Sequence, residues 1–142
     1  MRSTEFQVDA SSEKVIDITA QVKEFCAGQG DGLCLVFAPH ATAGLALMET
    51  GSGSEADLES TLERLLPHDD RYSHQHGSRG HGADHLLPVF ISPSLTVAVR
   101  EGRLVLGTWQ SIVLVDTNVD NPRRRIQCSF VPSPGEARLV QC

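Results

Sequence analysis

The first segments of the chain alternate polar and apolar positions before they change to a helical pattern. Residues 3–8 alternate with the period of a half-buried β-strand, and the apolar residues of 15–18 continue this pattern. Thr19 is expected to cap a short helix over residues 20–27, whose apolar side chains recur on one face. Gly28 is the expected end of that helix, because glycine readily adopts the backbone conformation that terminates helices.

A continuous apolar run follows at residues 32–38 and predicts a strand that is buried on both faces. This strand leads directly to His40. The next apolar residues, 45–47, fit either a strand or a helix, and periodicity does not separate the two. From Ser54 the apolar spacing predicts an amphipathic helix, with acidic residues early and a basic residue late. Pro67 ends this helix.

Residues 67–84 form a long polar segment that is rich in His, Asp and Gly. Loops of this length within a compact domain are usually functional or mobile, so we expect candidate chemistry here. Four strand-like runs follow, over residues 95–99, 103–107, 109–115 and 125–131. The turn signal Glu101-Gly102 joins the first two of these runs into a predicted hairpin.

The order of these elements favours an α+β fold in a single domain. Strands dominate, two helices interrupt them, and the regular helical crossovers of a doubly wound α/β sheet are missing. The chain has 142 residues, which suits one hydrophobic core. We assign the domain to residues 1–132 and interpret residues 133–142 as a weakly ordered C-terminal tail.

Composition narrows the functional classes. The chain has 18 acidic residues against 12 Lys and Arg, and its formal net charge of -6 opposes general binding to nucleic-acid phosphates. No apolar stretch has the length of a membrane span, so we expect a cytoplasmic protein without a membrane partner. The four cysteines lack a C-x-x-C pair, and we interpret Cys26, Cys34 and Cys128 as buried small hydrophobic residues.

The six histidines all lie between positions 40 and 85, namely His40, His68, His74, His76, His81 and His85. Neutral imidazole binds Zn, Cu, Ni and Fe well, and histidine also supplies acids and bases near neutral pH. No H-E-x-x-H motif is present. Spacing therefore leaves three interpretations open, which are a metal site, an acid-base site and a solvated polar loop.

Several other side chains are candidates for chemistry. His40 follows a predicted strand, where rigid scaffolds present reactive groups. Glu49 lies beyond an apolar segment and is either functional or a solvated end. Trp109 beside Gln110 combines a flat apolar surface with an amide, which suits a ring-bearing ligand, although core packing would explain Trp109 equally well. The arginines of 123–125 are either a solvated run or a site for phosphate or carboxylate.

A set of motifs occurs in order along the chain. It consists of His40-Ala41-Thr42-Ala43-Gly44, Glu49, Tyr72-x-His74, His85, Gly107-Thr108-Trp109-Gln110-x-Ile112 and Arg124-Arg125. This set resembles the YjbQ family, and the resemblance covers residues 1–132. It implies an α+β fold with a mixed β-sheet sandwich and two or three helices, assembled as a homotrimer with histidine-containing pockets near the subunit boundaries. The family is also described as a secondary thiamine-phosphate synthase, which is a transferase activity.

The resemblance carries site residues onto this chain by position. The implied catalytic side chains are His40, Glu49, His74 and His85. The implied metal ligands are His40, His74 and His85. Ligand binding is implied for Thr42, Trp109, Gln110 and Arg125.

Three positions depart from the family pattern. Ala41 stands where the family usually has Thr, Met48 where it has Asn, and Leu87 where a Lys commonly follows the second histidine. In addition, His81 and Asp84 occupy a stretch where acidic or Asn residues are usual, so the hydrogen bonds around the site are expected to differ. The roles of His68, His76 and His81 stay open.

The activity implied by the resemblance and the chemistry of the histidines point to different metals. Thiamine-phosphate synthesis needs a cation on the departing pyrophosphate and a surface for the ring, which Glu49 with a divalent ion, Arg125 and Trp109 would supply. Three histidines favour Zn or a similar ion, whereas Mg would serve phosphoryl chemistry through oxygen ligands.

Two alternatives to the transferase stay open. One is a metal-assisted hydrolase or lyase that acts on a phosphorylated small molecule, with Glu49 as general base. The other is a non-enzymatic trimer that binds a metal or a small ligand. In each case we expect a small anionic or phosphorylated ligand near His40, His85 and Arg125, with Trp109 as a wall.

Overall fold

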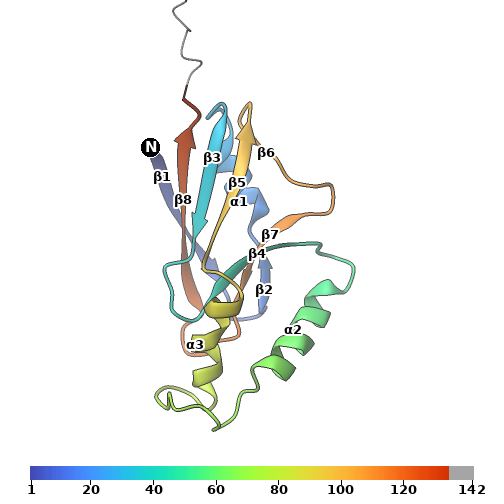
Figure 1. Ribbon diagram of the computed structural model, residues 1–142, viewed down its shortest axis with the longest axis vertical. Coiled ribbons are helices and arrows are strands. Elements are labelled where there is room, and N and C mark those ends of the chain that lie inside the picture. Colours follow the sequence, from blue (N-terminus) through green and yellow to red (C-terminus); the bar gives the residue numbers. More distant parts are fainter. Residues whose placement is uncertain (135–142) are drawn as a thin grey trace, which may run out of the picture.

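The computed structural model describes residues 1–134, and this part of the chain contains eight strands and three helices (Figure 1). In chain order they are β1 (Arg2–Asp9), β2 (Val15–Asp17), α1 (Thr19–Cys26), β3 (Gly32–Phe37), β4 (Gly44–Met48), α2 (Ser54–Leu65), α3 (His81–Phe90), β5 (Ser94–Arg100), β6 (Arg103–Leu104), β7 (Ser111–Val115) and β8 (Arg123–Pro132). Residues 135–142, which make up most of the predicted tail, lie outside the described residues. No described helix has the length and hydropathy of a membrane span.

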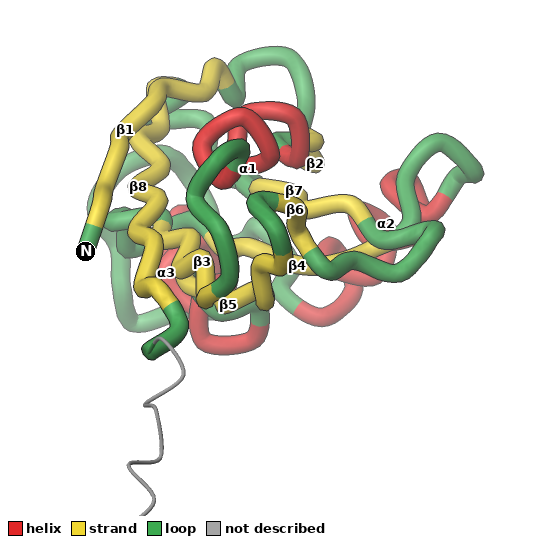
Figure 2. Tube along the Cα trace, turned by 90° about the horizontal axis from the view of Figure 1, so that it is seen from above, coloured by secondary structure: helices red, strands yellow, loops and turns green. Residues whose placement is uncertain are grey.

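The strands form two sheets. One has five strands in the order β1-β8-β3-β5-β6, and the other has three in the order β2-β7-β4. Every strand pair in the described part of the chain is antiparallel. Helices α2 and α3 both lie in the lower part of Figure 1, and Figure 2 shows α1 close to β2 and β7. The predicted α+β fold in one domain is confirmed.

Strand β7 explains how the layers are held together. Its four apolar residues, Ile112, Val113, Leu114 and Val115, are fully buried. Because successive side chains of a strand point to opposite faces, Ile112 and Leu114 join the core between the five-stranded sheet and α1. Val113 and Val115 join a second core with α2 and α3. The three-stranded sheet is therefore the middle layer of the molecule, and α2 and α3 cover its outer side.

Strand β3 differs from its prediction. Cys34 and Val36 are fully buried, but Leu33, Leu35 and Phe37 are 49%, 40% and 36% exposed. The prediction of a strand buried on both faces was wrong for the single chain, because only one face of the five-stranded sheet is covered by α1 and the three-stranded sheet. A continuous apolar run predicts that both faces of a strand are buried, but it does not show whether the same chain or another chain covers the second face.

The segment 45–47, for which the sequence left strand and helix open, is part of strand β4. Several local predictions are confirmed. The two predicted helices are α1 and α2. The predicted hairpin at Glu101-Gly102 joins β5 to β6, and its two central residues have φ angles of 50° and 73°. Two-residue hairpin turns with positive φ at both positions match the twist of the flanking strands, and they favour glycine.

Three element boundaries differ from the predictions. Thr19 is the first residue of α1 and not its cap, since its backbone N–H donates to Oδ1 of Asp17 at 2.9 Å and its hydroxyl accepts from the backbone of Ile112. The predicted run 103–107 is only a two-residue strand. The last strand before β8 begins at Ser111, so Trp109 lies in a turn.

Candidate metal centre

The polar segment before α3 and the first turns of α3 bring four histidines together. His74 and His76 belong to the loop that precedes α3, whereas His81 and His85 lie on α3 itself. Residues four apart on a helix lie on the same face, so the His81 and His85 rings are neighbours. One ring nitrogen from each of the four side chains lies within 4.8 Å of the other three.

The helix begins at His81 because of the residue before it. Gly80 has a φ of 77°, and a Cβ at this position would lie 2.5 Å from the backbone carbon of His68. Glycine is the residue that tolerates both the positive φ and the close approach. The sequence had indicated a loop as far as residue 84. The structure ends this loop earlier, and that places the first of the two helical histidines one turn before the second.

The ring nitrogens face one another closely. Nε2 of His81 lies 3.0 Å from Nε2 of His85, and the ring of His74 is centred 4.1 Å from that of His85 and 4.0 Å from that of His76. The pKa of His85 lies below its usual value, first because of partial desolvation and then because of the neighbouring imidazoles. Desolvation and then His76 lower the pKa of His74 in the same way. Low pKa values favour the neutral imidazole, which is the form that binds metals.

Carboxylates lie behind the buried member of the group. His81 is only 7% exposed, and its Nδ1 lies 3.0 Å from Oδ2 of Asp120 and 3.6 Å from Oδ2 of Asp84. Asp84 is buried, and its Oδ1 accepts hydrogen bonds from Thr117 at 2.7 Å and from Nε2 of His68 at 2.8 Å. His68 is therefore linked to the group through Asp84 and is not a member of it.

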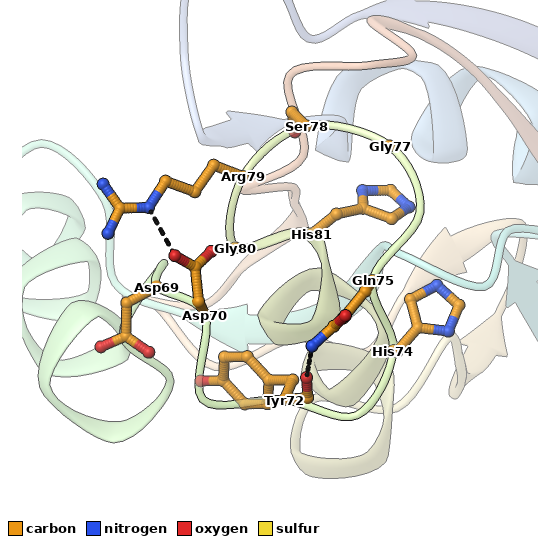
Figure 3. A pocket seen from close by; sticks show the side chains of 10 residues that line it. All are labelled: Asp69, Asp70, Tyr72, His74, Gln75, Gly77, Ser78, Arg79, Gly80 and His81. Carbon is orange, nitrogen blue, oxygen red and sulfur yellow. Dashed lines mark hydrogen bonds and ion pairs between the residues drawn. The ribbon is translucent and has the colours of Figure 1, made fainter.

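A hollow of about 420 Å³ opens beside the histidines (Figure 3). His74 and His81 line it, together with Tyr72, Asp70 and Arg79. Arg79 pairs with Asp70 at 3.3 Å, and both side chains are 75% exposed. Exposed pairs of this kind contribute little to stability, so Arg79 can exchange its partner for a bound anion at small cost.

His40 does not join these histidines in the described part of the chain. It follows the end of β3, beyond which β8 has no partner strand on the β3 side, and its Nε2 accepts a hydrogen bond from the backbone N–H of Arg125 at 2.9 Å. The pKa of His40 is lowered, first by burial and then by the charge of Arg124. The neutral ring thus continues the hydrogen bonding of the sheet at this point. The structure brings together His74 and His85 of the three metal ligands that the resemblance implied.

Thr42, two residues after His40, belongs to a buried polar network. Its hydroxyl accepts from Nη2 of Arg124 at 2.9 Å and from the amide of Asn118 at 3.2 Å. Arg124 is 2% exposed and forms a two-point ion pair with Asp116. The neighbouring Arg125 points to the other face of β8, is about half exposed, and lies 3.9 Å from Glu5. The guanidinium of Arg124 is therefore held by buried partners, whereas the guanidinium of Arg125 is accessible to a ligand.

The other expected site residues lie at the surface of the single chain. Glu49 is exposed and accepts a hydrogen bond from the hydroxyl of Ser52 at 3.0 Å. Trp109 is 73% exposed, so core packing does not explain it within one chain. The Gln110 side chain accepts from the backbone N–H of Gly107 at 2.8 Å and so closes the turn that presents Trp109. The buried state predicted for three of the cysteines is confirmed.

Sequence reasoning did not assign His76, His81 or Asp120 to the site. The spacing of four residues between His81 and His85 was a usable signal, since this spacing places two ligands on one face of a helix. The polar composition of the segment indicated a loop, however, and in a loop a spacing of four residues does not place two side chains on the same side. Asp120 lies more than thirty residues further along the chain, and nothing local to it indicates that it contacts this loop.

Fold and site together define a class: a small α+β domain of two antiparallel sheets that carries a histidine cluster at the start of its third helix. Within this class the chain belongs to the YjbQ family, since residues 4–133 match the family model described as "UPF0047 protein YjbQ-like". The family assignment made from the motifs is confirmed.

The chain is similar to UPF0047 proteins from bacteria and archaea. It is 62% identical to UPF0047 protein Rv2556c of Mycobacterium tuberculosis over 124 residues, which cover 87% of this chain and 93% of the relative. It is 38% identical to a UPF0047 protein of Archaeoglobus fulgidus over 116 residues, covering 82% and 89% of the two chains. Identity to YugU of Bacillus subtilis is 34% over 119 residues, covering 80% and 85%.

Solved structures share the fold. Hypothetical protein APE1520 of Aeropyrum pernix K1 matches with a TM-score of 0.83 and 28% identity, over 94% of this chain and 100% of that one. A protein of Sulfolobus solfataricus P2, described as YbjQ-like and of unknown function, matches with a TM-score of 0.83 and 27% identity, over 93% and 97% of the two chains. These likenesses support the fold and the family, and the names of these proteins assign no activity.

Proposed function

We propose that this protein binds a divalent transition metal through His74, His76, His81 and His85. The observation that carries the proposal is that one nitrogen from each ring lies within 4.8 Å of the other three. Zinc binds imidazole nitrogen at about 2.0 to 2.1 Å, so nitrogens around one ion lie within about 4.2 Å of one another. The four rings need only small rotations to reach this distance, and two of them are exposed and free to make them.

The donor set selects among metals. Imidazole suits Zn, Cu, Ni and Fe, whereas Mg prefers oxygen ligands and well-defined octahedral geometry. A Mg-dependent reaction at this cluster is therefore disfavoured. The proposed set also differs from the one that the resemblance implied, because it includes His76 and His81 and leaves His40 to the backbone of β8.

Two functional classes are consistent with four imidazoles. With zinc, catalytic sites commonly have three protein ligands and one water, while four protein ligands make a closed site. With Ni or Fe, which take more than four ligands, positions stay open for a water or a substrate oxygen. A bound metal of this kind would polarise a substrate oxygen or lower the pKa of a bound water. We propose a metal-dependent hydrolase or lyase as the first class and a non-enzymatic metal-binding protein as the second.

The substrate that we propose is a small anionic or phosphorylated molecule. The hollow beside the histidines is large enough for one, and Arg79 is the cation that lines it. Guanidinium groups bind phosphate and carboxylate through two parallel hydrogen bonds. Arg125 and Trp109, which the resemblance implied, stay predictions for ligand binding, as does a secondary thiamine-phosphate synthase activity. A homotrimer, a cytoplasmic location and the lack of a nucleic-acid partner also stay predictions.

Metal titration of variants tests the proposal. Wild-type protein is expected to bind about one Zn or Ni per chain in equilibrium dialysis, and its unfolding temperature should rise because the metal binds the folded state. His76→Ala removes an exposed side chain that is a ligand only in the proposed set. We expect it to weaken binding by more than the roughly 10- to 100-fold that loss of an outer carboxylate costs.

His40→Ala is the matched control, since His40 is a ligand only in the set that the resemblance implied. It should leave the affinity unchanged. If His40→Ala abolishes binding and His76→Ala does not, the metal belongs to the other set. If wild-type protein binds neither Zn nor Ni and shows no thermal shift, the histidines have acid-base roles only and the proposal fails.

A further inference from the structure

Asp120 connects the loop before α3 to the buried histidine of the cluster. Its Oδ2 accepts hydrogen bonds from the backbone N–H and the hydroxyl of Ser78, both at 3.0 Å. The same oxygen lies 3.0 Å from Nδ1 of His81. Figure 3 shows Ser78 at the apex of the loop that leads through Arg79 and Gly80 to His81. A single carboxylate oxygen therefore contacts both the loop and the first histidine of the helix.

His81 has an unusual environment for an imidazole. It is 7% exposed, and its Nδ1 makes no hydrogen bond of good geometry although Asp120 is at 3.0 Å and Asp84 at 3.6 Å. The distances to the two carboxylates are short, so we attribute the missing bond to the angle of the ring. A nitrogen between two carboxylates must carry its proton, because a lone pair there would face negative charge on both sides.

The protonated Nδ1 fixes what the other nitrogen can do. A neutral ring with its proton on Nδ1 has a lone pair on Nε2, and Nε2 is the atom that lies 3.0 Å from Nε2 of His85. Histidine ligands in metal sites commonly donate their second N–H to a carboxylate, which sets the tautomer and the direction of the ring.

We infer that Asp120 is a positioning residue for His81, holding the proton on Nδ1 so that Nε2 is available to a metal. The availability of Nε2 to a metal rests on the proposed metal centre, whereas the position of the proton on Nδ1 does not require a metal. Asp84 adds negative charge on the same side, while its other oxygen is occupied by His68 and Thr117. The Asp120 side chain is 36% exposed, so its removal should not unfold the protein.

The first test reads the tautomer in metal-free protein. Nitrogen-15 chemical shifts distinguish a protonated from an unprotonated ring nitrogen, and we would record them at about pH 8.5, roughly two units above the usual histidine pKa. Wild-type His81 is expected to show a protonated Nδ1 and an unprotonated Nε2. Asp120→Ala should shift the population toward a protonated Nε2. An unchanged tautomer in Asp120→Ala would overturn the inference.

The second test reads metal affinity. Asp120→Ala should weaken Zn binding about 10- to 100-fold, the usual effect of removing a carboxylate behind a histidine ligand. Ser78→Ala removes the hydroxyl bond from the loop to Asp120 and leaves the backbone N–H bond and the contact of Asp120 with His81, so it should bind Zn like wild type. Asp70→Ala removes an exposed charge from the same hollow and controls for general electrostatics.

The outcomes distinguish failure of the positioning role of Asp120 from failure of the proposed metal binding. If Ser78→Ala weakens binding as much as Asp120→Ala does, Asp120 acts by holding the loop, and the inference is wrong. The same holds if Asp70→Ala matches Asp120→Ala, because charge alone then explains the effect. If wild-type protein binds no Zn, the proposed function fails, while the nitrogen-15 shifts still decide the position of the proton on His81.

Discussion

At the scale of single residues, Asp116 and Arg124 form the most deeply buried ion pair of the described chain. Asp116 and Arg124 are each 2% exposed, and the pair is joined at two points. A buried pair of this kind adds little net stability compared with apolar residues, but removal of one partner leaves a charge without compensation. The remaining hydrogen bond of Arg124 to Thr42 cannot neutralise a guanidinium.

Asp116→Ala is therefore expected to lower the free energy of unfolding by about 3 to 5 kcal/mol. Urea denaturation followed by circular dichroism measures this change. Asp69→Asn is the matched control, since Asp69 also pairs with an arginine through two hydrogen bonds, but on an exposed side chain. Solvent screens such a pair, so little measurable change is expected. Equal effects of the two substitutions would contradict a special role for the buried pair.

At the scale of elements, His68 joins the two helices that cover the middle sheet. Its Nδ1 donates to Glu63 of α2 at 3.1 Å, and its Nε2 donates to Asp84 of α3 at 2.8 Å. Burial would lower the pKa of His68, but the hydrogen bonds to Asp84 and Glu63 outweigh burial and raise the pKa above its usual value. With both nitrogens donating, the ring is best held in its charged form, which connects the carboxylates of the two helices.

The stability that His68 contributes should depend on pH. Because the folded state binds the proton more tightly than the unfolded state, the contribution is fully present below the unfolded pKa of about 6.5 and is lost as pH rises through the higher folded value. We expect wild type to exceed His68→Gln in urea midpoint at about pH 5.5 and to lose most of this advantage by about pH 8.5.

His40→Gln provides a control of opposite sign. The pKa of His40 is lowered in the folded state, so the unfolded state binds the proton more tightly and wild type loses stability as pH falls below about 6.5. The advantage of wild type over His40→Gln should therefore shrink on acidification. The interpretation of His68 as a charged link fails if its variant shows no pH dependence or the same sign as the His40 variant.

At the scale of the whole molecule, the outer face of the five-stranded sheet is apolar at its centre. Leu33 and Leu35 of β3 and Val131 of β8 are 49%, 40% and 48% exposed there, and Leu33 pairs directly with Val131. Contiguous apolar patches on a sheet face commonly mark contacts between proteins. We propose that this face takes part in the homotrimer that the family resemblance implies.

Light scattering measures the assembly directly. Wild-type protein is expected to have three times the 15.4 kDa mass of one chain. Leu35→Lys places a charge at the centre of the outer face and should shift the mass toward that of a monomer. Leu65→Lys, at an exposed apolar position of α2, should stay trimeric. A monomeric wild type would contradict the predicted homotrimer. A trimeric Leu35→Lys protein would show that the subunits make contact through another surface.

Much of the fold could be predicted from local pattern. Alternation and short apolar runs predicted most of the strands, the period of 3.6 predicted α1 and α2, and Glu101-Gly102 predicted the hairpin, because each signal depends only on residues that are close in sequence. The site was predictable to a smaller degree. Clustering of the histidines and the ordered motifs indicated the segment of the candidate site, but the list of proposed ligands depended on where α3 begins.

The sequence alone thus determined most of the strands, the helices α1 and α2, the family and the segment that holds most of the histidines. Tertiary structure decided which side chains meet. Arg124 and Arg125 are neighbours of the same type, and alternation along β8 required that they point to opposite faces. Only the packing of the sheet against Asp116 and Thr42 decided which of the two is buried. Asp120 and His81 likewise approach each other because β7 and α3 pack in one core. Such contacts join distant segments, so no local pattern contains them.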